Sequence, residues 1–283
     1  MPVGTGPDDP GGAAVASSAP RRVVRLRTGA PRVERADSVA VEEPLEIRVN
    51  DKPFTVTMRT PGHDLELALG FLVAEGVIAS PDHVRTAMAC PDADQGNVVE
   101  VHLAHGVAPP DPSRHRQVSS ACGLCGTTSI GDVRAKGGRN VEDDPLQLDE
   151  RILFALPELL RAQQRGFDRT GGLHAAGLFD AEGTLLCLRE DVGRHNAVDK
   201  VVGWAFQLGL LPLSQRILQV SGRASFELVQ KAWLAGAPLL SAVSAPSSLA
   251  AELAEDAGMT LVGFNRNGSA VVYTGAHRIV SPG

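Results

Sequence analysis

The chain has 283 residues, a formal net charge of -6 and a hydrophobic content of 43%. This length and composition are enough for one or two domains with their own cores. The acidic balance argues against general binding of nucleic acid, because such binding needs a surplus of Lys and Arg. A phosphate-bearing ligand must therefore be met by a local cluster of basic side chains.

The cysteines are few and scattered: Cys90, Cys122, Cys125 and Cys187. They do not make the disulfide framework of a small secreted protein. The first twenty residues lack the basic and apolar segments of a signal peptide, and no run approaches the ~18 apolar residues of a membrane span. We therefore expect a cytoplasmic protein without membrane contact.

The chain begins with a segment of low hydrophobicity. Residues 1–21 consist mostly of small residues and proline, which predicts a disordered tail. The Arg-rich stretch at residues 21–35 is expected to be a solvated edge, although it could attract an acidic partner.

A small N-terminal α/β domain is predicted over residues 22–105. Apolar and polar residues alternate on both sides of Asn50 and Asp51, which tolerate the left-handed backbone of a tight hairpin turn. Residues 64–76 have helical spacing that ends at Gly76. Residues 97–104 predict a further strand.

Residues 106–146 predict a polar, Pro-rich linker and a mobile loop that carries the sequence CGLCG. Its thiols, Cys122 and Cys125, have a spacing used by zinc sites, redox pairs and sulfur carriers alike. Zinc would require a second ligand pair, whereas Cys90 and Cys187 stand alone. The spacing itself leaves these alternatives open.

Residues 147–283 predict a layered and mostly parallel α/β domain. A helix that starts after Asp149 precedes a hairpin at residues 171–191, and helices and strands then alternate to the end of the chain. Ligands in such sheets bind at the carboxyl ends of the strands. Three polar segments are expected there: "REDVGRHNAVDK", "SGRASFE" and "GFNRNGS".

These segments contain the candidate binding residues. His195 lies in the first segment and Arg223 in the second, each next to the start of a predicted helix, where anions bind favourably. In the third segment Phe264 could stack on a base and Arg266 could pair with a phosphate. Asn267 and Gly268 in the same segment also predict a hairpin turn.

Taken together and in this order, "CGLCG", "TGGLHAAGLFD", "REDVGRHNAVDKVVG", "SGRASFELVQKAW" and "VGFNRNGSAVVYTG" resemble the formate dehydrogenase accessory sulfurtransferase family, FdhD. The resemblance runs from about residue 40 to the C-terminus. It implies a cytidine deaminase-like fold, a homodimer and a role as a sulfur carrier. The sulfur would come from a cysteine desulfurase and go to the molybdenum-bis(molybdopterin guanine dinucleotide) cofactor of formate dehydrogenase.

The resemblance also implies roles for single residues. Cys122 matches the cysteine that carries the persulfide, and Cys125 matches its partner. The segment that contacts the guanine dinucleotide corresponds to Phe264, Asn265, Arg266, Asn267, Gly268 and Ser269. Many members of this family have a second basic residue near the end of the segment, whereas this chain has Ser269. The resemblance therefore leaves open how the phosphates are contacted. No permanent metal is expected, and the cofactor is treated as a bound substrate.

Two other functions remain open. One is a non-catalytic chaperone for the molybdenum cofactor in which the cysteine pair is a structural zinc clip. The other is a deaminase-like hydrolase, which needs a zinc-ligating His or Cys followed two residues later by a catalytic Glu. No His or Cys of this chain is followed by Glu at that spacing, which argues strongly against deamination.

Overall fold

The structure is a computed structural model that describes residues 16–90, 97–109 and 139–281. The first fifteen residues and the predicted loop with Cys122 and Cys125 lie outside this range. Among the described residues, no helix is long and apolar enough to cross a membrane.

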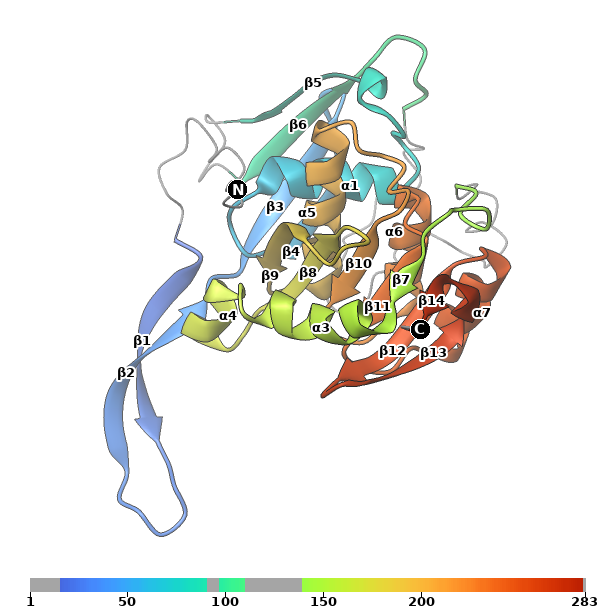
Figure 1. Ribbon diagram of the computed structural model, residues 1–283. Helices are drawn as coiled ribbons and strands as arrows, with labels where there is room; N and C mark the ends of the chain where they lie inside the picture. Colours follow the sequence, from blue (N-terminus) through green and yellow to red (C-terminus); the bar gives the residue numbers. More distant parts are fainter. Residues whose placement is uncertain (1–15, 91–96, 110–138, 282–283) are drawn as a thin grey trace.

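A two-stranded arm projects from the body of the molecule (Figure 1). It consists of β1 (Ser18–Arg25) and β2 (Val33–Ala40), which pair antiparallel over their whole length. The prediction of a disordered tail up to residue 21 was therefore wrong for residues 18–21, because this segment finds its hydrogen-bonding partners in β2. The Arg-rich stretch is exposed, as expected, but it forms part of this paired ribbon.

A four-stranded sheet in the order β4-β3-β6-β5 follows the arm. Its elements are β3 (Glu43–Val49), β4 (Lys52–Arg59), α1 (Asp64–Ala74), the 3-10 helix η1 (Pro81–His83), β5 (Val84–Ala89) and β6 (Val98–Leu103). The hairpin prediction is confirmed, since Asn50 and Asp51 both have positive φ angles, 50° and 65°. The predicted end of α1 is confirmed as well, because Gly76 follows it with a φ of 72°.

The larger part of the molecule contains the remaining elements. In chain order these are β7 (Leu148–Asp149), α3 (Glu150–Arg161), α4 (Arg165–Thr170), β8 (His174–Phe179), β9 (Leu185–Asp191), α5 (Arg194–Gln207), β10 (Ile217–Val220), α6 (Phe226–Ala235), β11 (Leu239–Ala242), α7 (Ser248–Asp256), β12 (Thr260–Arg266), β13 (Ser269–Thr274), the 3-10 helix η4 (Ala276–Arg278) and β14 (Ile279–Val280). Asp149 caps α3 as predicted, accepting a hydrogen bond from the Arg151 backbone N–H, and the helix continues through Pro157.

The six-stranded sheet has the order β13-β12-β11-β10-β8-β9 and is mixed. The pairs β10–β11 and β11–β12 are parallel, whereas β8–β9, β8–β10 and β12–β13 are antiparallel. The prediction of a mostly parallel sheet was therefore wrong. Both outer strands are joined to their neighbours by tight hairpins, which permit only antiparallel pairing.

Helices cover both faces of this sheet, and successive side chains of each strand point to opposite faces. On one face, Phe179 and Ile217 pack with Leu156 of α3. On the other face, Leu178 and Leu218 belong to the cluster that includes α5 and α6. The same cluster continues through α1 into the four-stranded sheet, so the two sheets share this core. Figure 1 shows α1 and α5 between the two sheets.

The crossing of α1 and α5 brings the two helix backbones into direct contact. A Cβ atom on Gly70 of α1 would lie 1.8 Å from the carbonyl oxygen of Asp199, and one on Gly203 of α5 would lie 1.8 Å from that of Glu66. Only glycine is compatible with so close an approach. These two glycines therefore fix how the N-terminal sheet sits on the larger part.

Candidate functional site

A cavity of about 600 Å³ opens where β10, β11 and β12 end. Ser221 directly follows β10, Val243 directly follows β11 and Arg266 ends β12; these three residues line one side of the cavity, and α3 and α4 form the opposite wall. Its volume lies within the range of about 300 to 1,000 Å³ that is typical of ligand sites. A ligand site was predicted at the carboxyl ends of the strands, and this cavity is the candidate for it.

Two basic side chains of the cavity wall differ in how they are paired. Arg161 forms an ion pair with Asp168 at 2.6 Å and lies over the ring of Phe167. Arg266 forms no ion pair with any carboxylate among the residues that the structure describes; its guanidinium lies 5.8 Å from the ring centre of Phe264. Arg266 is therefore available to an anionic ligand.

Phe264 has an unusual backbone. Its φ angle is 51°, in the left-handed region that a bulky side chain rarely adopts, and its side chain is 36% exposed. The backbone N–H donates to the carbonyl of Ser244 in the neighbouring loop, and the pairing of β12 with β13 is irregular between Gly263 and Arg266. This irregularity holds an aromatic ring at the surface beside Arg266.

The other residues of this segment have different positions. Asn267 and Gly268, with φ angles of 54° and 69°, form the turn of the β12–β13 hairpin, and the exposed Ser269 begins β13. Asn265 is fully buried; its side-chain amide donates to the Leu153 carbonyl and to Ser241 Oγ. The Asn265 side chain therefore anchors the segment to the core.

His174 lies in the cavity wall at the start of β8. Burial, together with the charges of Arg194 and His195, lowers the pKa of His174 below its ordinary value. Its imidazole is therefore neutral at neutral pH, with one nitrogen free to accept a hydrogen bond. His174 was not among the predicted binding residues, because only the antiparallel pairing of β8 with β10 brings it to this edge of the sheet.

The segment from Asp191 to Lys200 faces the N-terminal part of the chain. Lys200 Nζ lies 2.8 Å from Asp191 Oδ2 and donates to the backbone carbonyl of Thr60. Asp191 also accepts a hydrogen bond from the Thr60 N–H, and the Asn196 amide donates to the Met58 carbonyl. These buried polar groups hold the end of β4 against the larger part of the molecule.

His195 and Arg223, both predicted to bind the cofactor, do not line this cavity. His195 is buried and its Nε2 lies 2.6 Å from Glu227 Oε2, and this hydrogen bond holds the pKa of Glu227 below its ordinary range. Ser225 precedes α6, and its hydroxyl lies 3.3 Å from the same His195 nitrogen and makes no capping hydrogen bond to the helix. Arg223 is exposed on the loop after β10.

Sequence reasoning missed the contribution of α4 to the cavity. Glu190 accepts hydrogen bonds from the backbone N–H groups of Gly166 and Phe167, at 2.7 and 2.8 Å, and so fixes the start of α4. Phe167 and the buried Gln164 then line the cavity. The charge of Glu190 was visible in the sequence, but its partner lies 24 residues away and no spacing rule connects them.

The predicted sulfur-carrying residues Cys122 and Cys125 lie outside the described residues. Cys187 is buried in β9, and burial raises the pKa of its thiol to about 12, so it stays protonated. Cys90 follows β5 and is partly exposed. Neither Cys90 nor Cys187 lines the cavity.

Comparison with known proteins decides the family. The model of the FdhD/NarQ family matches residues 40–280. The chain belongs to the FdhD/NarQ family. It is 55% identical to the sulfur carrier protein FdhD of Streptomyces avermitilis, covering 92% of this chain and 94% of the relative, and 46% identical to that of Sulfolobus acidocaldarius, covering 88% and 93%.

The fold of the family is also found in a solved structure. A crystal structure of a formate dehydrogenase accessory protein from Desulfotalea psychrophila has a TM-score of 0.78 and 26% identity. The match covers 94% of this chain and all of the other. The resemblance inferred from the sequence motifs is thus confirmed, and the family has the mixed α/β architecture described above.

Proposed function

We propose that this protein is a sulfur carrier for the maturation of formate dehydrogenase. The single observation that carries this proposal is the match to relatives named sulfur carrier protein FdhD, which extends over about nine-tenths of the chain at up to 55% identity. The CGLCG sequence supplies the thiols that such a role requires.

Cys122 carries the sulfur in this proposal. Its thiolate attacks the terminal sulfur of a persulfide on a cysteine desulfurase, a new S–S bond forms on Cys122, and the desulfurase cysteine leaves as a thiolate. An acceptor then takes the terminal sulfur and Cys122 regains its thiolate. Cys125 either relays the sulfur or attacks the inner sulfur of the persulfide; in the second case the terminal sulfur leaves as hydrosulfide, and a thiol reductant must then reduce the Cys122–Cys125 disulfide to restore both thiols. The protein is thus a sulfurtransferase.

The acceptor in this proposal is the molybdenum-bis(molybdopterin guanine dinucleotide) cofactor, bound as a substrate. Two side chains of the cavity support a guanine nucleotide group there: Arg266, which has no carboxylate partner among the described residues, for a phosphate, and the neutral imidazole of His174 as a hydrogen-bonding group. Phe264 does not line the cavity, but it lies beside Arg266 and is exposed, so its ring is available for stacking on a base. A guanidinium and backbone groups at strand ends are the chemistry that binds phosphates in α/β sheets.

The order of the large sheet supports a cytidine deaminase-like description of the larger part. A hairpin, β8–β9, is followed by the parallel strands β10, β11 and β12, with helices on both faces. The pattern of cysteines favours a cytoplasmic location, in which the cysteine desulfurase and formate dehydrogenase would be the partners.

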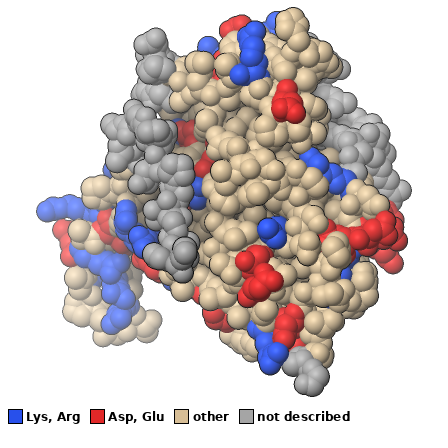
Figure 2. Space-filling model, turned by 45° about the horizontal axis from the view of Figure 1, so that its top comes forward, with Lys and Arg blue, Asp and Glu red and all other residues tan. Residues whose placement is uncertain are grey.

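We further propose that the protein is a homodimer and that the β1–β2 arm contributes to the contact. An isolated two-stranded ribbon is marginally stable in water. The arm nevertheless exposes Val24, Val33 and Val39. With the residues between its strands it spans residues 18–40, which contain six arginines and two acidic residues in a chain of net charge -6. Figure 2 shows basic side chains on this projecting part. The basic arm of one copy is therefore complementary in charge to a second copy of the chain, whose net charge is -6.

Light scattering tests the contact between copies. The wild-type chain is expected to have the mass of a dimer, and the double variant Arg25→Glu with Val33→Ser the mass of a monomer. These two side chains are paired neighbours on one face of the arm. A monomeric wild-type chain, or a double variant that stays dimeric, contradicts this part of the proposal.

Complementation tests the sulfur carrier role in cells. In a strain that lacks its own carrier gene, the wild-type chain is expected to restore formate dehydrogenase activity, and Cys122→Ala is expected to leave it at background. Cys90→Ala is the matched control, because Cys90 has no part in the proposal. Full activity with Cys122→Ala would show that another group carries the sulfur.

A further inference from the structure

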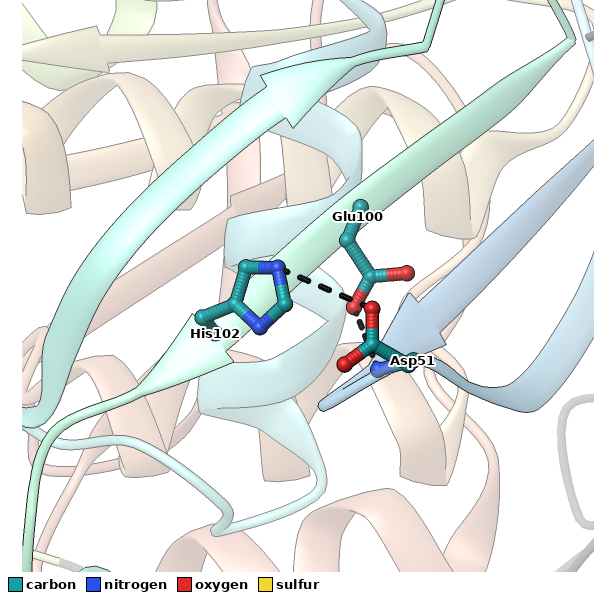
Figure 3. Close-up of side chains that lie close together, drawn as sticks. All are labelled: Asp51, Glu100 and His102. Carbon is teal, nitrogen blue, oxygen red and sulfur yellow. Dashed lines mark hydrogen bonds and ion pairs between the residues drawn. The ribbon is translucent and has the colours of Figure 1, made fainter.

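Three potential metal ligands meet at one end of the four-stranded sheet, away from the cavity described above (Figure 3). Glu100 and His102 lie two residues apart on β6 and therefore point to the same side of the sheet. Asp51 lies on the turn between β3 and β4. One ligand atom from each of the three side chains lies within 4.8 Å of the others.

The backbone holds these residues in register. The Asn50 N–H donates to the Val101 carbonyl, and Asn50 Oδ1 accepts a hydrogen bond from the Leu103 N–H. The Asp51 N–H donates to Glu100 Oε1 at 2.9 Å. The turn is thus attached to β6 on both sides of the cluster, so Asp51 stays next to Glu100 and His102 without any ligand.

Glu100 is the reason to expect a cation. Its residue is only 6% exposed, yet among the described residues no Lys or Arg forms an ion pair with it. Arg48 lies opposite Glu100 on β3 and interacts with its charge at longer range, but its guanidinium forms the ion pair with Glu46, at 2.8 Å. Buried carboxylates are normally paired with a cation or coordinate a metal, because burial of an uncompensated charge is costly.

The side chains of His102 and Asp51 are also suitable as metal ligands. The His102 side chain is 19% exposed, and its Nε2 lies 4.0 Å from Asp51 Oδ1. This distance is somewhat larger than the distance between two ligand atoms that bind the same metal ion, since each metal–ligand bond is about 2.1 Å long. The Asp51 side chain is 85% exposed and can rotate to close the gap. Solvent can fill the remaining coordination positions.

We propose that Asp51, Glu100 and His102 bind a divalent transition metal ion such as Mn²⁺ or Zn²⁺. Two carboxylates and one imidazole offer the oxygen and nitrogen ligands that these ions accept. The ion neutralises Glu100 and ties the β3–β4 turn to β6. The site is independent of sulfur transfer, since it uses neither the cysteine pair nor the cavity.

Mn²⁺ is the best probe, because it prefers oxygen and nitrogen ligands over the thiolates of Cys122 and Cys125. Titration of the full chain with Mn²⁺, followed by the loss of the free-ion signal in electron paramagnetic resonance, is expected to show one ion bound per chain. Asp51→Asn and His102→Gln are each expected to weaken binding about tenfold or more. Asn tolerates the positive φ of position 51, so this variant keeps the turn.

Asp82→Asn and His105→Gln are the matched controls, because both side chains are exposed and lie outside the cluster. They are expected to bind Mn²⁺ as the wild-type chain does. The absence of saturable binding would overturn the proposal. So would binding that Asp51→Asn and His102→Gln leave unchanged, or binding that is lost when Cys122 and Cys125 are replaced by serine.

Discussion

Lys200 and Asp191 form a buried ion pair within the larger part, and both side chains make hydrogen bonds to the backbone of Thr60 in the N-terminal part. Removal of this pair is therefore a direct test of how the two parts are held together. The side chains are 1% and 0% exposed, and Nζ lies 2.8 Å from Oδ2. Lys200→Met keeps the apolar stem but removes the ammonium group. The Asp191 carboxylate then lacks its cation, and the Thr60 carbonyl loses the hydrogen bond that Lys200 donates to it.

Removal of one partner of a buried pair costs about 3 to 5 kcal/mol, because the other charge stays buried without compensation. A folded domain is stable by only about 5 to 15 kcal/mol, so Lys200→Met is expected to lose a large share of the free energy of unfolding. Denaturation by urea, followed by circular dichroism, measures this loss.

Lys52→Met is the matched control, because Lys52 is exposed at the start of β4. It is expected to change the free energy of unfolding by less than about 0.5 kcal/mol. If Lys200→Met unfolds at the same urea concentration as the Lys52→Met control, the segment from Asp191 to Lys200 does not hold the end of β4 in the way described here.

Three further predictions concern the helix crossing, the cavity and the buried thiol. Gly203→Ala is expected to lower the melting temperature, because the added Cβ would lie 1.8 Å from the Glu66 carbonyl oxygen. In a free helix the same change stabilises by about 1 kcal/mol. A higher melting temperature would therefore contradict the close crossing of α1 and α5. Arg266→Gln is expected to weaken the binding of guanosine diphosphate about tenfold in calorimetry, whereas the exposed Arg85→Gln leaves it unchanged; equal affinities would remove Arg266 from the site. Because burial raises the pKa of the Cys187 thiol to about 12, Cys187 is expected to resist alkylation of the native protein up to about pH 9, and peptide masses showing rapid labelling would contradict this.

Local features of the fold could be predicted from the sequence. The Asn50–Asp51 turn, the helix end at Gly76 and the N-cap at Asp149 depend on backbone preferences of a few consecutive residues. The mixed pairing of the large sheet could not be predicted from the alternation of helices and strands alone. The ribbon of β1 and β2 escaped prediction because its strands have little apolar periodicity and gain order by pairing with each other.

The site was predictable only in part. The rule that ligands bind at strand ends led to Arg266 and Phe264, and these two residues do lie together. Asn265 has the same polar character in the sequence, but strand alternation turns its side chain into the core. The charges at Asp191 and Lys200 suggested a ligand, whereas they bind backbone groups of Thr60, about 130 residues earlier in the chain. Such long-range pairing has no signal in a single sequence.

The central claim is that Cys122 holds the transferred sulfur, and mass spectrometry tests it most directly. The purified chain is incubated with a cysteine desulfurase and cysteine, and its peptides are then analysed without reductant. We expect the peptide that contains Cys122 to gain the mass of one sulfur atom, and the Cys122→Ala chain to gain none. A wild-type Cys122 that acquires no sulfur, while the desulfurase releases it to other acceptors, would contradict the account.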